Sequence, residues 1–473
     1  MNLTDFSLND KNQPLYQQIY QRFVQSIQQG VLIPGQRVPS IRTLASELQL
    51  SRSTVELAYG ILVETGYLEA RGSAGTIVSM RLEKLQTSKP ATGRVSSQED
   101  DSVSLFTSGT ENLPRPYQLG LPALDLFPRK VWANLNTRHL RLQNHFLSLP
   151  QPAGYPPLRE AIASYLQVSR GLSCVPQQVF ITAGYKGALN LIGRTLIQPL
   201  DQIWIEDPCF PPSRQLLTNM GAELIPVPVD QDGLCVKIGK ELAPKARFAL
   251  VTPASQSPLG VSLSLERRVE LLSWAKENNA FIIEDDYDSE YRYDGCKLPV
   301  LASAGSSDNV LYIGTFSKIL SPSLRLGYLV VPMELLSCFN SACQTWQDGS
   351  PLLNQVVLSD FMKENHLSRH LRKTRAAYAI RRKMVIDSLR SVFGDRMYFD
   401  MPACGLHLLA RLHHSENDVE LVRRAKQYDI SIGALSARAH QNDCGKGLLL
   451  GFANVTCYEQ AMKQAQSLTR LFD

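Results

Sequence analysis

Residues 310–331, VLYIGTFSKILSPSLRLGYLVV, decide the fold of the larger part of this chain. Two apolar, strand-like runs, 310–313 and 326–331, flank a turn that carries hydroxyl groups, a lysine and an arginine. A lysine amine can form an imine with a carbonyl group, whereas hydroxyls and a guanidinium can hold a phosphate. The turn therefore indicates a site for an anionic ligand with a carbonyl group, and a polar turn with a solvated lysine is the alternative. The side chains concerned are Thr315, Ser317, Lys318 and Arg325.

From residue 118 onward, apolar runs alternate with helical segments such as 187–197 and 265–278. Several of the runs are rich in β-branched residues, as expected for strands that are covered on both faces. This alternation predicts an α/β fold with a mostly parallel, seven-stranded sheet. The predicted strands are residues 179–183, 202–206, 223–229, 246–252, 280–285, 310–315 and 326–331.

Polar and aromatic residues follow the ends of five of these strands. In open α/β sheets the ligand lies at the carboxyl ends of the strands, so five loops are expected to form one site. A carboxylate there can pair with a protonated ring nitrogen, a phenol can donate to a ring oxygen, a flat ring can stack, and a lysine can hold an aldehyde as an imine. A helix N-terminus, hydroxyls and a guanidinium can hold phosphate. In that order, the residues are Asp285, Tyr287, Phe210 and Lys318, and then Gly184, Tyr185, Thr315, Ser317 and Arg325. Ser257, which follows the fourth strand, is a further candidate for cofactor binding. Together they describe a pocket for pyridoxal 5'-phosphate.

The N-terminal part carries three helical patterns and a short β-ribbon. Apolar residues repeat at helical spacing over residues 15–29, and two shorter helices are predicted at 40–48 and 52–65. A tight turn between the shorter helices is typical of a helix-turn-helix, whose second helix enters the major groove of DNA. The ribbon, residues 67–79, would form a wing whose tip arginine can enter the minor groove. A small helical dimerisation module is the alternative.

Composition limits the function classes. A net charge of +5 over 473 residues gives no global polycation, so a DNA-binding surface must be local. Nine cysteines without a CxxC pair argue against a zinc site or a disulfide framework, and we expect no metal. Without an apolar signal segment or a membrane-spanning run, we expect a soluble, cytoplasmic protein.

The predicted organisation has two folded regions and a tether. We place a DNA-binding domain at residues 10–80, a flexible polar linker at 81–112, and an effector and dimerisation domain at 113–473. A smaller α+β subdomain is expected at about 333–473. The linker would let the DNA-binding domain reorient, or would be a passive spacer.

Residues 14–78, which include PSIRTLASELQLSRSTVELAYGILVETGYLEARGSAGTIV, closely resemble the winged helix-turn-helix of GntR-type bacterial regulators. The resemblance implies contacts with double-stranded operator DNA from the first short helix, from the start of the second and from the wing. The residues in these positions are Arg42, Ser51, Arg52, Ser53, Thr54, Arg71 and Gly72.

A second resemblance covers residue 118 to the C-terminus. The motifs FITAGYKGALNLI, TPASQSPLG, IIEDDYDSEYRYDG and YIGTFSKILSPSLRLGYLV resemble the fold type I aminotransferase region of MocR/GabR regulators, a subfamily of GntR-type transcriptional regulators. The resemblance implies a homodimer that binds pyridoxal phosphate. It makes Lys318 the Schiff-base lysine, with Asp285 at the pyridine nitrogen, Tyr287 at the phenolic oxygen, and Thr315 and Arg325 at the phosphate.

The sequence departs from this family at three places. The family often has histidine at the position of Ser255 and a hydroxyl-bearing residue at that of Ala183. By alignment, Leu449 stands where aminotransferases carry the arginine that grips the substrate's α-carboxylate, and an apolar side chain cannot form that clamp. Ordinary transamination is therefore not expected, unless Arg214, Arg115 or another arginine substitutes.

Three functions follow as hypotheses. The first is a transcriptional regulator that binds pyridoxal phosphate and senses a small amine, an amino acid or the cofactor itself, the last with a link to vitamin B6 metabolism. The second is a working aminotransferase with an appended DNA-binding module. The third is a repressor whose C-terminal domain has lost the cofactor and only dimerises. We favour the first, with Lys318 as the anchor of a sensor rather than a catalyst.

Overall fold

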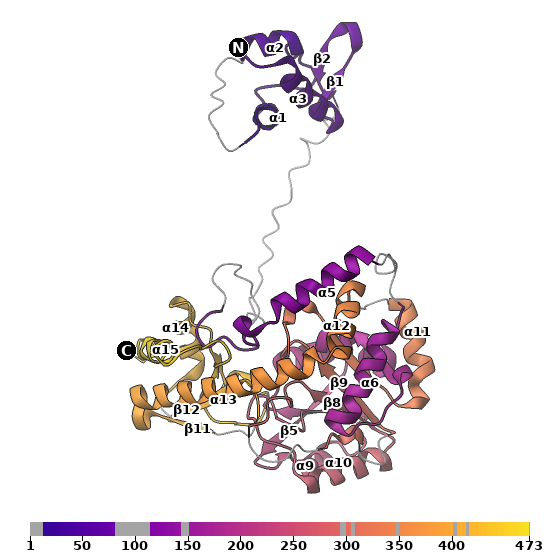
Figure 1. Ribbon diagram of the computed structural model, residues 1–473, viewed down its shortest axis with the longest axis vertical. Helices are drawn as coiled ribbons and strands as arrows, with labels where there is room; N and C mark the ends of the chain where they lie inside the picture. Colours follow the sequence, from indigo (N-terminus) through magenta and orange to yellow (C-terminus); the bar gives the residue numbers. More distant parts are fainter. Residues whose placement is uncertain are drawn as a thin grey trace. The chain divides into compact units, whose positions relative to one another are not determined.

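The computed structural model describes residues 13–80, 114–142, 151–293, 299–303, 308–346, 350–400, 404–412 and 416–472. These residues fall into two compact units, one on each side of residues 98 and 99 (Figure 1). The predicted linker, residues 81–112, lies outside the described residues, so the predicted domain boundaries stay a prediction.

The N-terminal unit is a winged helix-turn-helix, as predicted. Its second and third helices begin where serine side chains cap them: Ser40 accepts a hydrogen bond from the Thr43 N–H, and Ser51 accepts one from the Thr54 N–H. Apolar residues from all three helices and both strands form its core. The elements are α1 Leu15–Gln28, α2 Ile41–Glu47, α3 Arg52–Glu64, β1 Leu68–Ala70 and β2 Thr76–Val78.

The second unit is built on an eight-stranded sheet in the order β3-β10-β9-β8-β7-β4-β5-β6. All seven predicted strands are present. The eighth, β6, was missed because it has only two residues. β10 and β6 run antiparallel to their neighbours, and the others are parallel. The strands are β3 Val179–Thr182, β4 Gln202–Asp207, β5 Glu223–Asp230, β6 Gly233–Leu234, β7 Phe248–Val251, β8 Phe281–Asp286, β9 Val310–Thr315 and β10 Gly327–Val330.

Both faces of this sheet are buried, which explains the uninterrupted apolar runs. Successive strand residues enter different cores: Ile282 belongs to the larger apolar cluster and Ile283 to the smaller one. Helices α7, α8 and α11 contribute to the smaller cluster, and α6 and α10 to the larger. The covering helices include α5 Arg129–Leu142, α6 Pro156–Arg170, α7 Gly184–Leu196, α8 Pro211–Asn219, α9 Val236–Leu242, α10 Leu265–Glu277, α11 Leu336–Trp346 and α12 Leu352–Lys363.

A second, four-stranded antiparallel sheet has the order β11-β12-β14-β13. The first strand of this smaller sheet is β11. The two helices that precede it in the chain belong to the main sheet, because α11 packs against α7 and α12 packs against α5 and α6. The long helix α13 packs against α12 on the side of the main sheet and against α15 and β11 on the side of the smaller sheet, so it joins the two sheets of this unit (Figure 1). The elements are α13 His366–Phe393, β11 Met397–Asp400, β12 His407–Leu412, α14 Asp418–Gln427, β13 Gly433–Ala434, β14 Gly447–Gly451 and α15 Tyr458–Thr469. No helix within the described ranges could cross a membrane.

Candidate functional site

The sheet brings the predicted loops to one edge. Strands β3, β4, β7, β8 and β9 are parallel, so their carboxyl ends lie together, and the antiparallel β10 starts at the same edge. The strand register shows this alignment: Gly327, at the start of β10, pairs with Thr182 at the end of β3 and with Thr315 at the end of β9. Asp286 in turn pairs with Gly314.

One corner of this edge suits a phosphate. Helix α7 begins at Gly184, whose φ of +75° is in the left-handed region that favours glycine. A Cβ built there would lie 3.8 Å from Ser317 Oγ and 4.0 Å from Arg325 Nη1, so the helix N-terminus, the hydroxyl and the guanidinium converge. The Thr315 hydroxyl accepts a hydrogen bond from the Ser317 N–H at 3.1 Å and shapes the turn. A helix N-terminus with such neighbours is a ready anion site.

The groups predicted to face a pyridine ring are buried and unsatisfied. Within the described part of the chain, Asp285 Oδ1 and the Tyr287 hydroxyl have no hydrogen-bond partner. Burial, with the nearby Asp286 and Asp288, raises the pKa of the Asp285 carboxyl well above its ordinary value. A buried carboxyl without a donor is costly, and a protonated ring nitrogen would satisfy it. The Ser255 hydroxyl, where the family often has histidine, lies beside Tyr287.

Lys318 is half-buried at the centre of the site. Its Nζ donates a hydrogen bond to the carbonyl oxygen of Gly120 at 3.1 Å. Burial lowers the pKa of the amine, although the carboxylates of Asp288 and Asp285 oppose this shift. A lowered pKa increases the fraction of neutral amine, which is the form that attacks a carbonyl carbon.

The remaining predicted residues line the same region. The rings of Tyr185 and Phe210 meet edge to face, with centroids 6.2 Å apart, and the Tyr185 hydroxyl bonds that of Ser213 at 2.7 Å. Ser257 is less central, because its N–H donates to the Thr252 hydroxyl at 3.3 Å. That hydroxyl in turn donates to the buried carboxylate of Glu206.

The sequence did not single out Arg438, which ends a short 3-10 turn, Ser436–Arg438. Its side chain is buried, and none of the described carboxylates pairs with it. Burial lowers the pKa of its guanidinium to about 10, and its charge in turn lowers the pKa of Lys318. Arg214 lies nearby and donates to the carbonyl of Ala439 at 3.3 Å. One cation, Arg438, therefore acts on the lysine, and Arg214 contacts the loop that carries it.

Leu449 lies in an apolar cluster. It faces Leu409 across β12 and β14 and packs with Leu435, so no clamp forms at that position. Of the arginines considered as substitutes, Arg115 is engaged, because its Nε lies 2.9 Å from Asp429. Arg438 has no local sequence signal, since its position depends on how the loop folds back onto β4.

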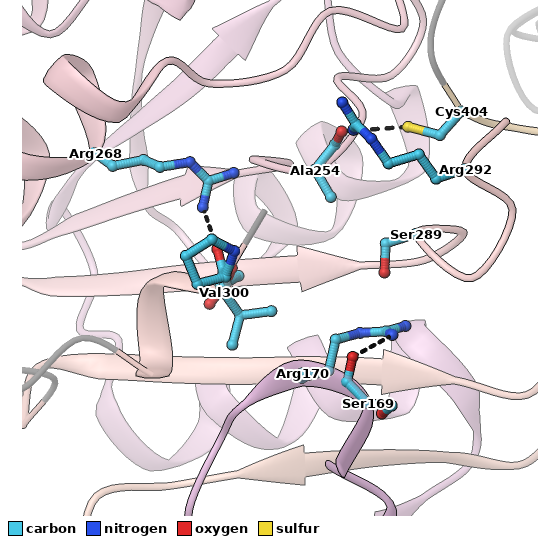
Figure 2. Close-up of a pocket in the computed structure, with 10 residues that line it drawn as sticks. Ser169, Arg170, Ala254, Arg268, Ser289, Arg292, Val300 and Cys404 are labelled. Atoms are coloured by element: carbon cyan, nitrogen blue, oxygen red, sulfur yellow. Dashed lines mark hydrogen bonds between the residues drawn. The ribbon is translucent and has the colours of Figure 1, made fainter. Parts of the chain in front are cut away.

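A second pocket lies beside β8 (Figure 2). Two of its three arginines, Arg170 and Arg268, are already engaged, whereas the buried Arg292 Nε has no hydrogen-bond partner among the described residues. Arg170 pairs with Asp286 at 2.7 Å, and Arg268 donates to three backbone carbonyls at 2.6 to 2.8 Å. Figure 2 shows Arg268 and Arg170 apart from each other, with Val300 drawn between them. The Arg170–Asp286 pair beside this pocket joins the end of α6 to the end of β8, the strand that carries Asp285.

The predicted DNA contacts lie at the expected places in the N-terminal unit. Arg42 on α2 and Arg52 and Ser53 in the first turn of α3 are exposed, and Arg71 and Gly72 are at the exposed wing tip. Ser51 and Thr54 bond each other at the start of α3, as a helix cap. The sequence did not single out Arg37, whose guanidinium lies against Gly75 in the wing: a Cβ there would be 2.8 Å from Arg37 Nε.

Two protein families match the chain. Residues 120–426 match Aminotransferase class I and II, and residues 15–78 match Bacterial regulatory proteins, gntR family. The probable rhizopine catabolism regulatory protein MocR of Rhizobium meliloti is 34% identical over 457 residues, 94% of this chain and 91% of that protein. The chain belongs to the MocR-type branch of the GntR family. The fold and the family predicted from the sequence are confirmed.

A further relative of this MocR-type chain matches about four fifths of its length. The HTH-type pyridoxine biosynthesis transcriptional regulator PdxR of Corynebacterium glutamicum is 30% identical and covers 79% of this chain and 78% of its own. Among solved structures, an archaeal alanine:glyoxylate aminotransferase is similar with a TM-score of 0.71 and 24% identity, over 79% of this chain and 93% of that one. This likeness shows the aminotransferase fold.

Proposed function

We propose that this MocR-type regulator binds operator DNA through α3 and the wing, and binds pyridoxal phosphate at the edge of the main sheet. It responds to a small effector that carries both an amine and a carboxylate, and it acts as a homodimer, the usual state of aminotransferase-like folds. Membership of the GntR family supports the DNA-binding part. The single observation that carries the effector class is Arg438, a buried cation beside Lys318 that no described carboxylate neutralises.

The residues of the site fit the cofactor. The unsatisfied Asp285 and Tyr287 match its ring nitrogen and ring oxygen, and the corner around Gly184 and Arg325 matches its phosphate. When bound, the cofactor would supply an aldehyde that captures a primary amine. Lys318, with its lowered pKa, would hold that aldehyde until an effector amine replaces it.

The carboxylate of the effector would be held by Arg438, with Arg214 behind it. A guanidinium and a carboxylate form strong, paired hydrogen bonds, and burial strengthens them. The departure at Leu449 by itself favoured sensing of the cofactor. Arg438 favours an amino acid over the cofactor as the effector, because it supplies a cation for a carboxylate at a position other than that of Leu449. The cofactor itself stays the second candidate, since one relative is named as a regulator of pyridoxine biosynthesis.

Two aminooxy probes test this effector class without knowledge of the effector. Aminooxyacetate and methoxyamine react with an aldehyde through the same group, but only aminooxyacetate carries a carboxylate. We expect the cofactor-loaded protein to react at least about tenfold faster with aminooxyacetate, since a charge-assisted pair contributes more than 1.4 kcal/mol. Arg438→Met removes that preference and leaves the methoxyamine rate nearly unchanged. An equal rate for both probes in the wild type would refute the carboxylate assignment.

Cofactor binding has its own test. The purified protein should show a visible absorption band that Lys318→Ala abolishes, and absence of the band would leave a domain that only dimerises. Turnover of an amino donor and a keto acid decides the enzymatic alternative. We expect no sustained turnover over a broad panel of substrates, whereas steady turnover would establish a working aminotransferase.

A further inference from the structure

The loop that carries Arg438 is held at both ends. At its start, Asp418 accepts hydrogen bonds from the Ser436 N–H at 2.9 Å and from the Ser436 hydroxyl. Asp418 also accepts from the Gly447 N–H at 3.1 Å, which fixes the return of the loop into β14. All of these contacts lie within the smaller sheet and its helix α14.

The other end is held by Asp207, the last residue of β4 in the main sheet. Its carboxylate, 1% exposed, accepts from three successive backbone N–H groups: His440 at 2.7 Å, and Gln441 and Asn442 at 2.8 Å each. The Asn442 side chain donates a fourth hydrogen bond at 2.9 Å. Consecutive N–H groups that converge on one anion form a strong and directional contact.

The segment after β4 adds bonds to the same loop. The Cys209 N–H donates to the carbonyl of Arg438 at 3.1 Å, and Arg214 donates to that of Ala439. Residues 207–214 thus run along residues 438–442 and hold the backbone of Arg438 itself. These bonds act against the tendency of a desolvated guanidinium to turn out toward water.

We propose that Asp207 is a positioning residue for effector recognition: it holds the loop so that Arg438 stays inside the site. Asp207 itself binds neither the effector nor the cofactor in this assignment. The inference rests on the proposed function of Arg438. It explains why a carboxylate is buried at the end of β4 with only backbone and amide donors around it.

The test uses full-length, cofactor-loaded Asp207→Asn and the two aminooxy probes. An asparagine keeps the shape but places an N–H₂ group against N–H donors, so the loop loses part of its anchor. We expect the preference for aminooxyacetate to fall about tenfold, with the methoxyamine rate and the visible absorption nearly unchanged. Amide hydrogen exchange at residues 440–442 should become faster. Asp230→Asn, which removes a contact with Arg267 at the end of β5, is the matched control and should change neither readout.

The outcomes separate the two proposals. If exchange at residues 440–442 rises and the probe preference stays at the wild-type level, Asp207 only anchors the loop and the positioning role is wrong. If Arg438→Met keeps the preference, the proposed effector class fails, whatever Asp207 does. If Asp207→Asn does not retain the cofactor, Asn442→Ala decides, because it removes only the fourth hydrogen bond. A smaller drop of about twofold to fivefold supports the proposal, and no drop overturns it.

Discussion

Replacing Arg438 by methionine should stabilise the ligand-free protein. Arg438 is 7% exposed, and burial lowers the pKa of its guanidinium from its ordinary value to about 10. At 1.36 kcal/mol per pKa unit, holding the charge in this place costs about 3 kcal/mol. The cost is fully present at every pH below about 10, because the side chain is then charged in both the folded and the unfolded states. Methionine fills a similar volume without a charge.

Tryptophan fluorescence can follow this change in the effector domain alone. All four tryptophans lie after residue 113, and two of them, Trp204 and Trp274, stack 3.8 Å apart in the core of the main sheet. For a region of this length we expect a melting temperature about 3–6 °C higher in Arg438→Met at pH 7.5. The same variant should lose the preference for aminooxyacetate, so stability and recognition change in opposite directions.

Arg381→Met is the matched control. Arg381 is equally buried, at 7%, but its guanidinium pairs with Asp125 at 2.6 Å and with the carbonyl of Ala453. Removing it leaves these acceptors without a donor and should destabilise the domain by about 1–3 kcal/mol. If Arg438→Met melts at or below the wild type while Arg381→Met is destabilised as expected, the buried charge of Arg438 does not carry this cost.

Three further predictions test other parts of the molecule. Burial raises the pKa of Glu206 to about 7, so the folded state holds its proton more tightly and the unfolding free energy should fall by about 3 kcal/mol as pH rises from 4.5 through 7. Melting at pH 5 and pH 8 should show that Glu206→Gln lacks this fall. Gly327→Ala would place a Cβ 2.8 Å from the Gly184 Cα, so absorption titration should show at least about tenfold weaker cofactor binding. Gly60→Ala is the control, because its Cβ meets open space and cofactor binding should not change. Arg52→Ala should weaken operator binding about tenfold or more at physiological salt, and unchanged binding in a fluorescence anisotropy titration contradicts the assignment of α3.

The sequence predicted the parts of the site that are local to strand ends. Lys318, Asp285 and Gly184 each follow an apolar run, and a parallel sheet must bring such ends together. It did not predict the direction of β10. The connection from β9 has no helix long enough for a parallel crossover, so the antiparallel return could have been inferred.

The place of Arg438 in the site could not be predicted from the sequence, for a different reason. Its place depends on hydrogen bonds between Asp207 and a loop more than 200 residues away, and neither segment carries a periodic pattern. Long-range contacts of single polar groups leave no local signal, whereas strands and caps do. The departure at Leu449 did give a clue, because losing one cation raised the question of which other arginine replaces it.

The uncompensated charges of the site explain how a sensor on this fold can have different free energies with and without its effector. A ligand shifts an equilibrium only by its differential affinity for the two states. Cofactor binding would satisfy Asp285, but it leaves Arg438 buried without a carboxylate partner among the described residues. A carboxylate effector would remove that remaining cost of about 3 kcal/mol, which corresponds to a shift of about a hundredfold in a two-state equilibrium. The free energy available for a signal is therefore concentrated at the Arg438 loop, where Asp207 joins the main sheet to the smaller one.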